Sequence, residues 1–233
     1  MENQKLALRL KNIFLPPDFI AFFKKFSKRP PLKVKRGGVV FYEGDTPGKL
    51  YLISRGFVKL YRSSPEGRST IIYLYGPGSM LAVRALIHAD KELKHTAEAI
   101  TDAEIITLSE KDYLEAVKEN PEYLIDLLHV FIDRLNYTER KLEGFILTDT
   151  TARVASFLYD LAIRFGEKVP PAGGGKTVIP LPLTHQTIAE FVGAFRETVT
   201  VAINRLIKDG LLEDKRGKIT ILDIKKLKSQ ALI

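Results

Sequence analysis

Residues 184–210 read THQTIAEFVGAFRETVTVAINRLIKDG, which predicts two short helices joined by a turn at Gly193. Thr184 can cap the first helix, because its hydroxyl can accept a hydrogen bond from a backbone N–H of the first helical turn. The apolar positions recur at helical spacing. They are Ile188, Ala189 and Val192 in the first helix and Val199, Ile203 and Leu206 in the second. The two helices fit a helix-turn-helix, and by themselves they also fit an ordinary helical hairpin.

The outer face of the second helix carries polar side chains near its N-terminus. The outward residues there are Arg196, Glu197, Thr200 and Val201. A DNA-binding helix-turn-helix presents this part of its second helix to the major groove. Arginine can bond to the O6 and N7 atoms of guanine together, and glutamate can accept from the cytosine amino group. We therefore expect these four residues to contact DNA bases.

A hairpin with a basic tip is predicted after the second helix, at residues 213–221. Gly217 lies at its tip, and its basic side chains are Lys215, Arg216 and Lys218. Such a hairpin is typical of a wing that lies along the DNA backbone, and it favours a DNA-binding motif over an ordinary helical hairpin. We also expect Thr184 and His185 to contact phosphate, because helix N-termini attract anions.

The positive charge of the protein is concentrated in the same part of the chain. The sequence has 36 Lys and Arg against 28 Asp and Glu, a net charge of +8. Residues 1–150 hold 23 basic and 20 acidic side chains, a difference of +3, whereas residues 151–233 hold 13 and 8, a difference of +5. A denser positive charge in the shorter C-terminal part is expected if a polyanion binds there.

A heptad pattern precedes this C-terminal part. Its positions alternate spacings of four and three residues: Leu124, Leu128, Phe131, Leu135, Thr138, Leu142 and Phe145. The pattern predicts a helix over about residues 121–147, followed by a hinge at residues 148–150 that also caps the next helix. An apolar stripe this long indicates a symmetric homodimer. The helix can instead lie across its own β-domain, and both arrangements can hold on different faces.

The N-terminal part alternates short β-rich runs with glycine turns. The runs cover residues 39–42, 50–53, 57–61, 70–74 and 104–108. Short strands at this spacing indicate an antiparallel β-sandwich or roll. A helix is predicted over residues 16–26, with one apolar face made of Phe19, Phe22, Phe23 and Phe26. Another helix is predicted to begin after Ser109, with Asp112 completing its cap.

These segments resemble the CRP/FNR superfamily of bacterial transcription regulators over about residues 32–222. The matching segments are Glu43–Asp45, Leu50–Ile53, Gly56–Leu60, Thr187–Gly193 and Arg196–Val199. The resemblance implies an α+β fold, with an N-terminal antiparallel β-roll (residues 1–118), a long dimerisation helix (119–149) and a C-terminal winged helix-turn-helix (150–233). It also implies a homodimer that binds a palindromic site on double-stranded DNA, regulates transcription and contacts RNA polymerase.

Three positions depart from the family pattern. Members that bind cyclic AMP carry a Gly-Glu pair and an Arg-Ser/Thr-Ala triplet, because Arg clamps the cyclic phosphate and Glu holds the ribose hydroxyl. Val83 stands where that Glu would be, and residues 93–97 contain no Arg. We therefore expect no conventional cyclic AMP site, and assign an effector pocket for another ligand to Arg84, Lys94 and Thr138. Val201 stands where related helices commonly have a further Arg, and it can contact a thymine methyl instead.

Composition and motif spacing exclude several other classes of sensor and enzyme. The chain has no cysteine, which rules out disulfides and the iron–sulfur cluster of the oxygen-sensing branch. The haem branch uses a histidine near Arg84, and none stands there. No two of His88, His95, His129 and His185 have the i, i+4 spacing of a helical metal site. The segment Gly175–Thr177 lacks the earlier glycine of a P-loop, so nucleotide hydrolysis is not expected.

The sequence thus predicts a dimeric, sequence-specific transcription regulator under the control of an unidentified effector. We expect no metal, no permanently bound cofactor and no enzymatic activity. With no apolar run of about 20 residues and no signal peptide, we expect a cytoplasmic protein without a membrane partner. Two alternatives stay open: a cyclic-nucleotide receptor with an altered pocket, and a ligand-binding regulatory module that acts through protein partners.

Overall fold

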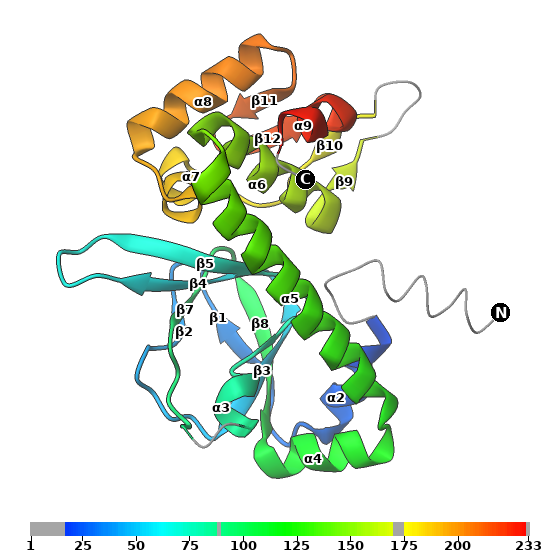
Figure 1. Ribbon diagram of the computed structural model, residues 1–233. Coiled ribbons are helices and arrows are strands. Elements are labelled where there is room, and N and C mark those ends of the chain that lie inside the picture. Colours follow the sequence, from blue (N-terminus) through cyan, green and yellow to red (C-terminus); the bar gives the residue numbers. More distant parts are fainter. Residues whose placement is uncertain (1–16, 88–89, 170–174, 232–233) are drawn as a thin grey trace. The chain divides into compact units, whose positions relative to one another are not determined.

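The computed structural model describes residues 17–87, 90–169 and 175–231 (Figure 1). The chain forms two compact units. The first holds the described residues up to Arg68 together with Ile72–Arg134, and the second holds Ser69–Ile71 and the described residues from Leu135 onward. His88 and residues 170–174 lie outside the described part. None of the described helices is long and apolar enough to span a membrane.

The first unit is built on eight short strands. They are β1 (Leu32–Val34), β2 (Val39–Phe41), β3 (Lys49–Arg55), β4 (Val58–Ser63), β5 (Ser69–Tyr75), β6 (Met80–Leu81), β7 (Thr96–Ala99) and β8 (Ala103–Ser109). They form two four-stranded sheets, with strand orders β1-β8-β3-β6 and β2-β7-β4-β5. Every pair with a defined register is antiparallel, so the predicted β-roll is confirmed. The sequence did not indicate β1, β6 and β7, which have two to four residues each.

The central strand β3 has apolar side chains on both faces because each face is covered. Tyr51 and Ile53 belong to one buried cluster, whereas Leu50 and Leu52 belong to another. This alternation follows from the two-residue period of a strand. The second cluster also contains residues of the helices α2 (Pro17–Phe26), α4 (Glu110–Glu119) and the first half of α5 (Glu122–Leu147).

The apolar face predicted for residues 16–26 packs in this second cluster. Phe19 and Phe23 are buried, and the Phe19 ring meets Tyr123 of α5 edge to face at 5.0 Å between ring centroids. The cap of α4 is also confirmed. Ser109 accepts a hydrogen bond from the Asp112 backbone N–H at 3.1 Å, and the Asp112 carboxylate accepts from the Ser109 N–H at 3.3 Å. A short helix that the sequence did not indicate, α3 (Val83–Ile87), follows β6.

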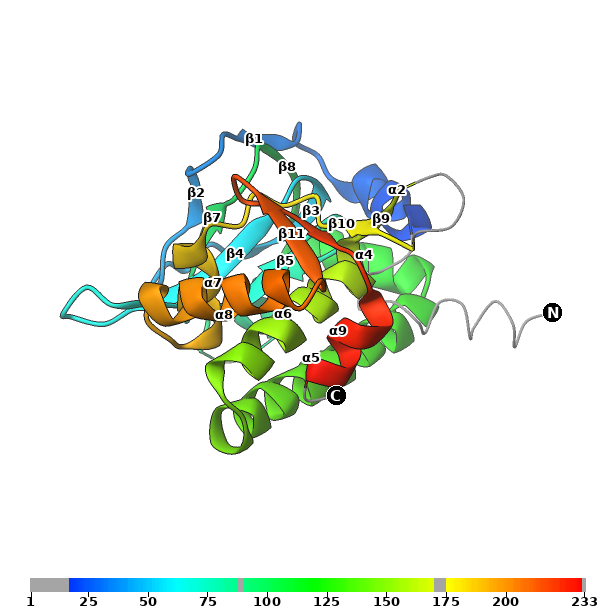
Figure 2. The same ribbon diagram turned by 90° about the horizontal axis from the view of Figure 1, so that it is seen from above.

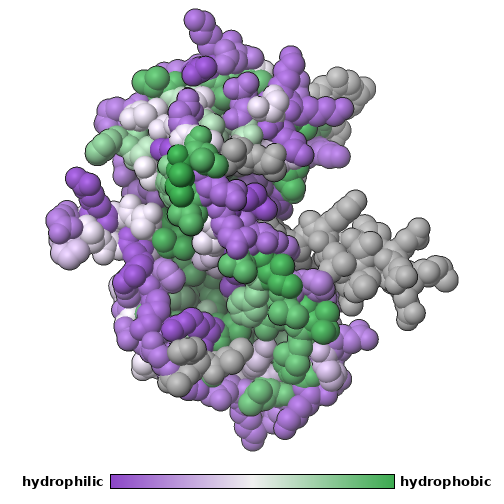
Figure 3. All heavy atoms as spheres, viewed as in Figure 1, coloured by the Kyte–Doolittle hydropathy of each residue, from purple (hydrophilic) through white to green (hydrophobic). Residues whose placement is uncertain are grey.

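The helix α5 has two different apolar faces. Tyr123, Leu127 and Val130 are buried in the first unit, so one face of this helix does lie across its own β-domain. The seven heptad positions lie on another face, and all of them are exposed in the single chain. Leu135 and Leu142 are 59% and 60% exposed. In Figure 3, hydrophobic side chains gather over the N-terminal half of this helix, and hydrophilic side chains interrupt them further along. The heptad positions from Leu124 to Leu142 are therefore exposed to a partner.

The second unit combines helices with a small sheet. It contains α6 (Thr150–Phe165), β9 (Glu167–Lys168), β10 (Thr177–Val178), α7 (His185–Val192), α8 (Arg196–Lys208), β11 (Leu212–Lys215), β12 (Lys218–Ile221) and α9 (Ile224–Gln230). Its four strands have the order β11-β12-β10-β9. As predicted, the segment at 148–150 caps α6: the Asp149 carboxylate accepts from the Ala152 N–H. The helix α6 packs against α7, α8 and α9, which fixes the position of the helix-turn-helix on its own unit (Figure 2).

Candidate nucleic-acid interface

The turn between α7 and α8 has the predicted cap and the predicted glycine. The Thr184 hydroxyl accepts a hydrogen bond from the Thr187 N–H at 3.0 Å and so caps α7. Gly193 ends α7 with φ of +62° and ψ of +50°, the left-handed conformation that glycine adopts without a steric penalty. The chain can therefore reverse within three residues and begin α8 at Arg196.

Gly193 is also in close contact with the end of α5. A Cβ at this position would lie 2.7 Å from Cε1 of Phe145. The Arg153 guanidinium lies 5.5 Å from the centroid of the Phe145 ring, and it donates hydrogen bonds to the carbonyls of Thr148 and Val192. The Phe145 side chain therefore packs within its own chain on one side, in addition to its predicted place in the dimer seam.

We expect Gly193→Ala to destabilise the second unit by about 2–4 kcal/mol, because the left-handed backbone is strained and the Phe145 ring must move. Chemical denaturation measures the loss. Gly210→Ala is the matched control, since Gly210 has φ of +70° and nothing within 4 Å of an added Cβ. That variant should lose only about 1–2 kcal/mol. Equal losses in the two variants would contradict the Phe145 contact.

The helix α8 presents most of the predicted reading face. Val199, Ile203 and Leu206 are buried, as expected, while Arg196, Glu197 and Val201 are exposed. Val201 is 69% exposed. Thr200 is half-buried, and its hydroxyl donates to the Arg196 carbonyl at 3.0 Å. Three of the four predicted side chains are thus free to meet DNA, and the fourth is held on its own helix.

His185 links three elements of the second unit. Its Nε2 lies 3.2 Å from an Asp214 carboxylate oxygen in β11, and its Nδ1 lies 2.9 Å from the Thr200 hydroxyl in α8. A carboxylate can only accept, so Nε2 carries a proton and donates to Asp214. The other Asp214 oxygen accepts from the Gly217 N–H at 2.8 Å. The ring therefore orients the wing relative to α8, and a phosphate contact from it would have to replace one of these bonds.

The wing turns at its predicted tip. Arg216 and Gly217 have φ of +56° and +82°, which match a two-residue hairpin turn whose twist suits the flanking strands. Lys215 pairs with Lys218 across the hairpin, and both are exposed. The Lys215 ammonium, with help from Lys176, holds the pKa of Glu213 below its usual range. Among the described residues, no carboxylate lies within salt-bridge distance of the Lys218 ammonium, in contrast to Lys176 and Lys215.

The effector residues predicted for the β-roll meet at one carboxylate. Asp90 lies 2.9 Å from the Lys94 ammonium and 3.6 Å from the Arg84 guanidinium. The hydrogen bond from Lys94, together with one from the Glu92 N–H, lowers the pKa of Asp90 to about 2. Val83 is only 3% exposed, and the preceding Ala82 has φ of +64°. Thr138 is exposed and belongs to the other unit.

The histidines of the described residues do not form a metal site. Among the described residues, no group of three or more His, Asp and Glu side chains is placed to hold a metal ion. Burial is the main reason that the pKa of His95 is lowered, and the nearby Arg62 lowers it further. Both effects favour the neutral form of the His95 imidazole.

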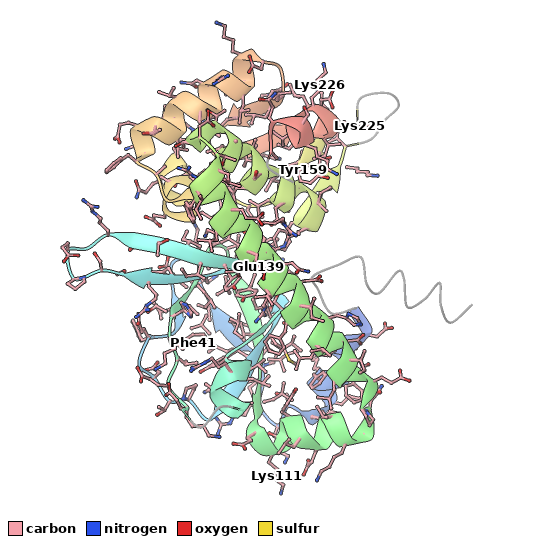
Figure 4. All side chains as sticks on the ribbon, viewed as in Figure 1. Phe41, Lys111, Glu139, Tyr159, Lys225 and Lys226 are labelled. Atoms are coloured by element: carbon pink, nitrogen blue, oxygen red, sulfur yellow. The ribbon has the colours of Figure 1, made fainter. Side chains whose placement is uncertain are left out.

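Two features of the second unit were not predicted from the sequence. Phe195, the N-cap of α8, is 72% exposed, and its non-polar side chain at a capping position was the available signal. The exposed lysines of α9 were also not assigned. Figure 4 shows two of them, Lys225 and Lys226, at the surface. They account for part of the positive charge that the sequence places in this part of the chain.

Two family models match the chain. A Crp-like helix-turn-helix domain matches residues 152–230, and a cyclic nucleotide-binding domain matches residues 31–120. The first corresponds to the second unit from α6 to α9. The second covers the strands of the β-roll and α4.

Similar proteins match this chain over most of their length. The CRP-like cAMP-activated global transcriptional regulator of Mycobacterium tuberculosis is 31% identical over 215 residues, 92% of this chain and 93% of that protein. The transcriptional regulator SdrP of Thermus thermophilus is 31% identical over 206 residues, 87% of this chain and 95% of that protein. A crystal structure of a CRP/FNR family transcriptional regulator from Thermus thermophilus has a TM-score of 0.69 at 30% identity, covering 86% and 97% of the two chains.

Proposed function

This chain belongs to the CRP/FNR family of DNA-binding transcription regulators, and on that premise we propose that it is a homodimer that binds a palindromic DNA site. The observation that carries the proposal is the exposed N-terminal face of α8, with Arg196 and Glu197, on the same unit as a basic wing. Two such units related by a two-fold axis would read two half-sites of opposite direction.

In this proposal α8 reads bases and the wing holds the backbone. Arg196 bonds to a guanine edge, Glu197 accepts from a cytosine amino group and Val201 contacts a thymine methyl. Lys215, Arg216 and Lys218 contact phosphates, with Thr184 and His185 at the start of α7. Thr200 supports the reading face through His185 and the Arg196 carbonyl.

We expect Lys218→Ala to weaken binding to every DNA sequence by a similar factor and to lower the salt dependence by about one unit of slope. The reason is that a phosphate contact releases one counterion. Titration of a duplex at several salt concentrations measures the slope. Lys111→Ala, on α4 of the first unit (Figure 4), is the control and should leave the slope unchanged.

This titration also tests the proposed function itself. A regulatory module that acts through protein partners would show no salt-dependent affinity for DNA. If the wild-type protein binds no duplex at low salt, the proposed function fails.

We propose that the effector is a ligand other than cyclic AMP, because the chain lacks a conventional cyclic AMP site. Val83 is apolar where a ribose-binding carboxylate is needed, and Arg84 and Lys94 already face Asp90. A phosphate would have to displace this carboxylate from both cations. The lowered pKa of Asp90 means that it keeps its negative charge at neutral pH.

Calorimetry with cyclic AMP should therefore show no binding at micromolar concentrations, because both groups that recognise the nucleotide are absent. Relatives named as cAMP-activated favour the second candidate, a cyclic-nucleotide receptor with an altered pocket. Micromolar or tighter binding would support that candidate and contradict ours.

The proposed partner, location and lack of enzymatic activity are those expected of a CRP/FNR family member. The chain would act on transcription through RNA polymerase, in the cytoplasm and without an enzymatic step. The relatives reported above are named as transcriptional regulators, and none of those names describes an enzyme.

A further inference from the structure

Phe195 is the most exposed large apolar side chain among those described, at 72%. It is the N-cap residue of α8, with φ of −77° and ψ of 149°, and its side chain makes no capping hydrogen bond. The residue directly precedes Arg196, at the end of the helix that the proposed function places in the major groove.

The fold does not explain a phenylalanine at this position. The N-caps of four other described helices are side chains that accept hydrogen bonds from the helix: Ser109, Asp149, Thr184 and Asp223. Such residues stabilise a helix because they satisfy backbone N–H groups that have no partner within it. Phe195 neither supplies this bond nor buries its ring.

We propose that Phe195 is a specificity-determining residue, whose ring contacts the 5-methyl group of a thymine close to the base pair read by Arg196. The inference rests on the proposed function, because it requires α8 to enter the major groove. The 5-methyl of thymine is the apolar feature of that groove, and phenylalanine is one of the side chains that contact it.

The charge around Phe195 fits DNA as the partner. Arg196 follows it directly, and the second unit carries the denser positive charge of the chain. An apolar ring beside exposed basic groups suits a polyanion with apolar groups in its groove. Val201, also exposed, lies six residues after Phe195, about 1.7 turns further along α8, so its proposed methyl contact is a separate one.

The first test is Phe195→Ser, which should change stability and binding in opposite directions. Serine adds the missing cap, so the thermal midpoint should rise by about 2–4 °C. Affinity for the selected DNA site should fall, because the methyl contact is lost. Ile207→Ser is the control, since Ile207 is exposed on the same helix but near its C-terminal end. The affinity of this variant for the selected DNA site should equal that of the wild type.

The second test removes single methyl groups from the DNA. In the duplex obtained by binding selection, each thymine is replaced in turn by deoxyuridine, which keeps the base pair and loses only the methyl. Wild-type affinity should fall about fourfold for each half-site at one position, the effect expected for one buried methyl. The Phe195→Ser protein should be indifferent to deoxyuridine at that position and remain sensitive at the one contacted by Val201.

The outcomes separate this inference from the proposed function. If wild type selects a site through Arg196 but deoxyuridine has the same effect on wild type and Phe195→Ser everywhere, Phe195 reads no methyl and the inference is wrong. The same holds if Phe195→Ser lowers affinity for all sequences equally, which would indicate a contact with the sugar–phosphate backbone. If wild type selects no site, the proposed function fails first.

Discussion

Replacing Leu135 and Leu142 together by glutamate should convert the protein from a dimer to a monomer. Both side chains lie on the exposed face of α5 at heptad positions, and each is about 60% exposed in the single chain. In a symmetric dimer the seam brings each residue close to the partner helix, so the variant would bury four carboxylates in an apolar interface. Sedimentation velocity measures the mass directly.

The expected effect on DNA binding is larger than that of any single contact. Two linked reading units bind a palindrome with an affinity that exceeds one unit's affinity by about 10²–10⁴-fold. The monomer should lose this factor on the full site and keep the weak affinity of a half-site. Far-ultraviolet circular dichroism should show unchanged helix content.

Leu114→Glu is the matched control for this variant. Leu114 is 48% exposed on α4, away from the heptad face. It tests whether a charge at an exposed leucine outside the heptad face leaves the dimer intact. A double variant that remains dimeric while its helix content is normal would exclude the heptad face as the interface.

The features that the sequence predicted have a local cause. The helices α5, α6, α7 and α8 carry regular apolar periods, and the caps at Ser109 and Thr184 depend on residues within three positions. Gly193 was predictable as a turn because it stands between two such periods. The longer strands β3, β4, β5 and β8 were found because each is a run of β-forming residues, and glycine turns separate several of these runs along the chain.

The features that the sequence did not indicate depend on distant residues or on very short elements. The two-residue β6 and the four-residue β7 carry too little of a period to be recognised, whereas the three-residue β2 was found from the glycine turn that follows its run. His185 is held by Asp214, which lies 29 positions further along the chain. The two faces of α5 could be recognised as alternatives, but only the packing of Tyr123 and Leu127 assigns one of them to the chain's own core.

Arg196→Ala should cost about 1–3 kcal/mol on the selected site and remove the preference for one base pair in each half-site. The exposed guanidinium stands in the first turn of α8, from which a bidentate contact with guanine is possible. Arg205→Ala is the control, because Arg205 is an exposed arginine in the last turn of the same helix. Binding selection on randomised duplexes reports both affinity and base preference.

Val201→Arg tests the same placement of α8 in the major groove through a gained base preference rather than a lost one. Val201 lies four residues after Glu197, so the two side chains share one face of α8. If this face enters the major groove, the new guanidinium should add a preference for guanine at one position in each half-site, where wild type accepts thymine. A loss of preference in Arg196→Ala has several structural causes, whereas a new guanine at one defined position requires residue 201 to meet that base. An unchanged selected motif in Val201→Arg would therefore refute the proposed orientation of the helix, even if DNA binding itself persists.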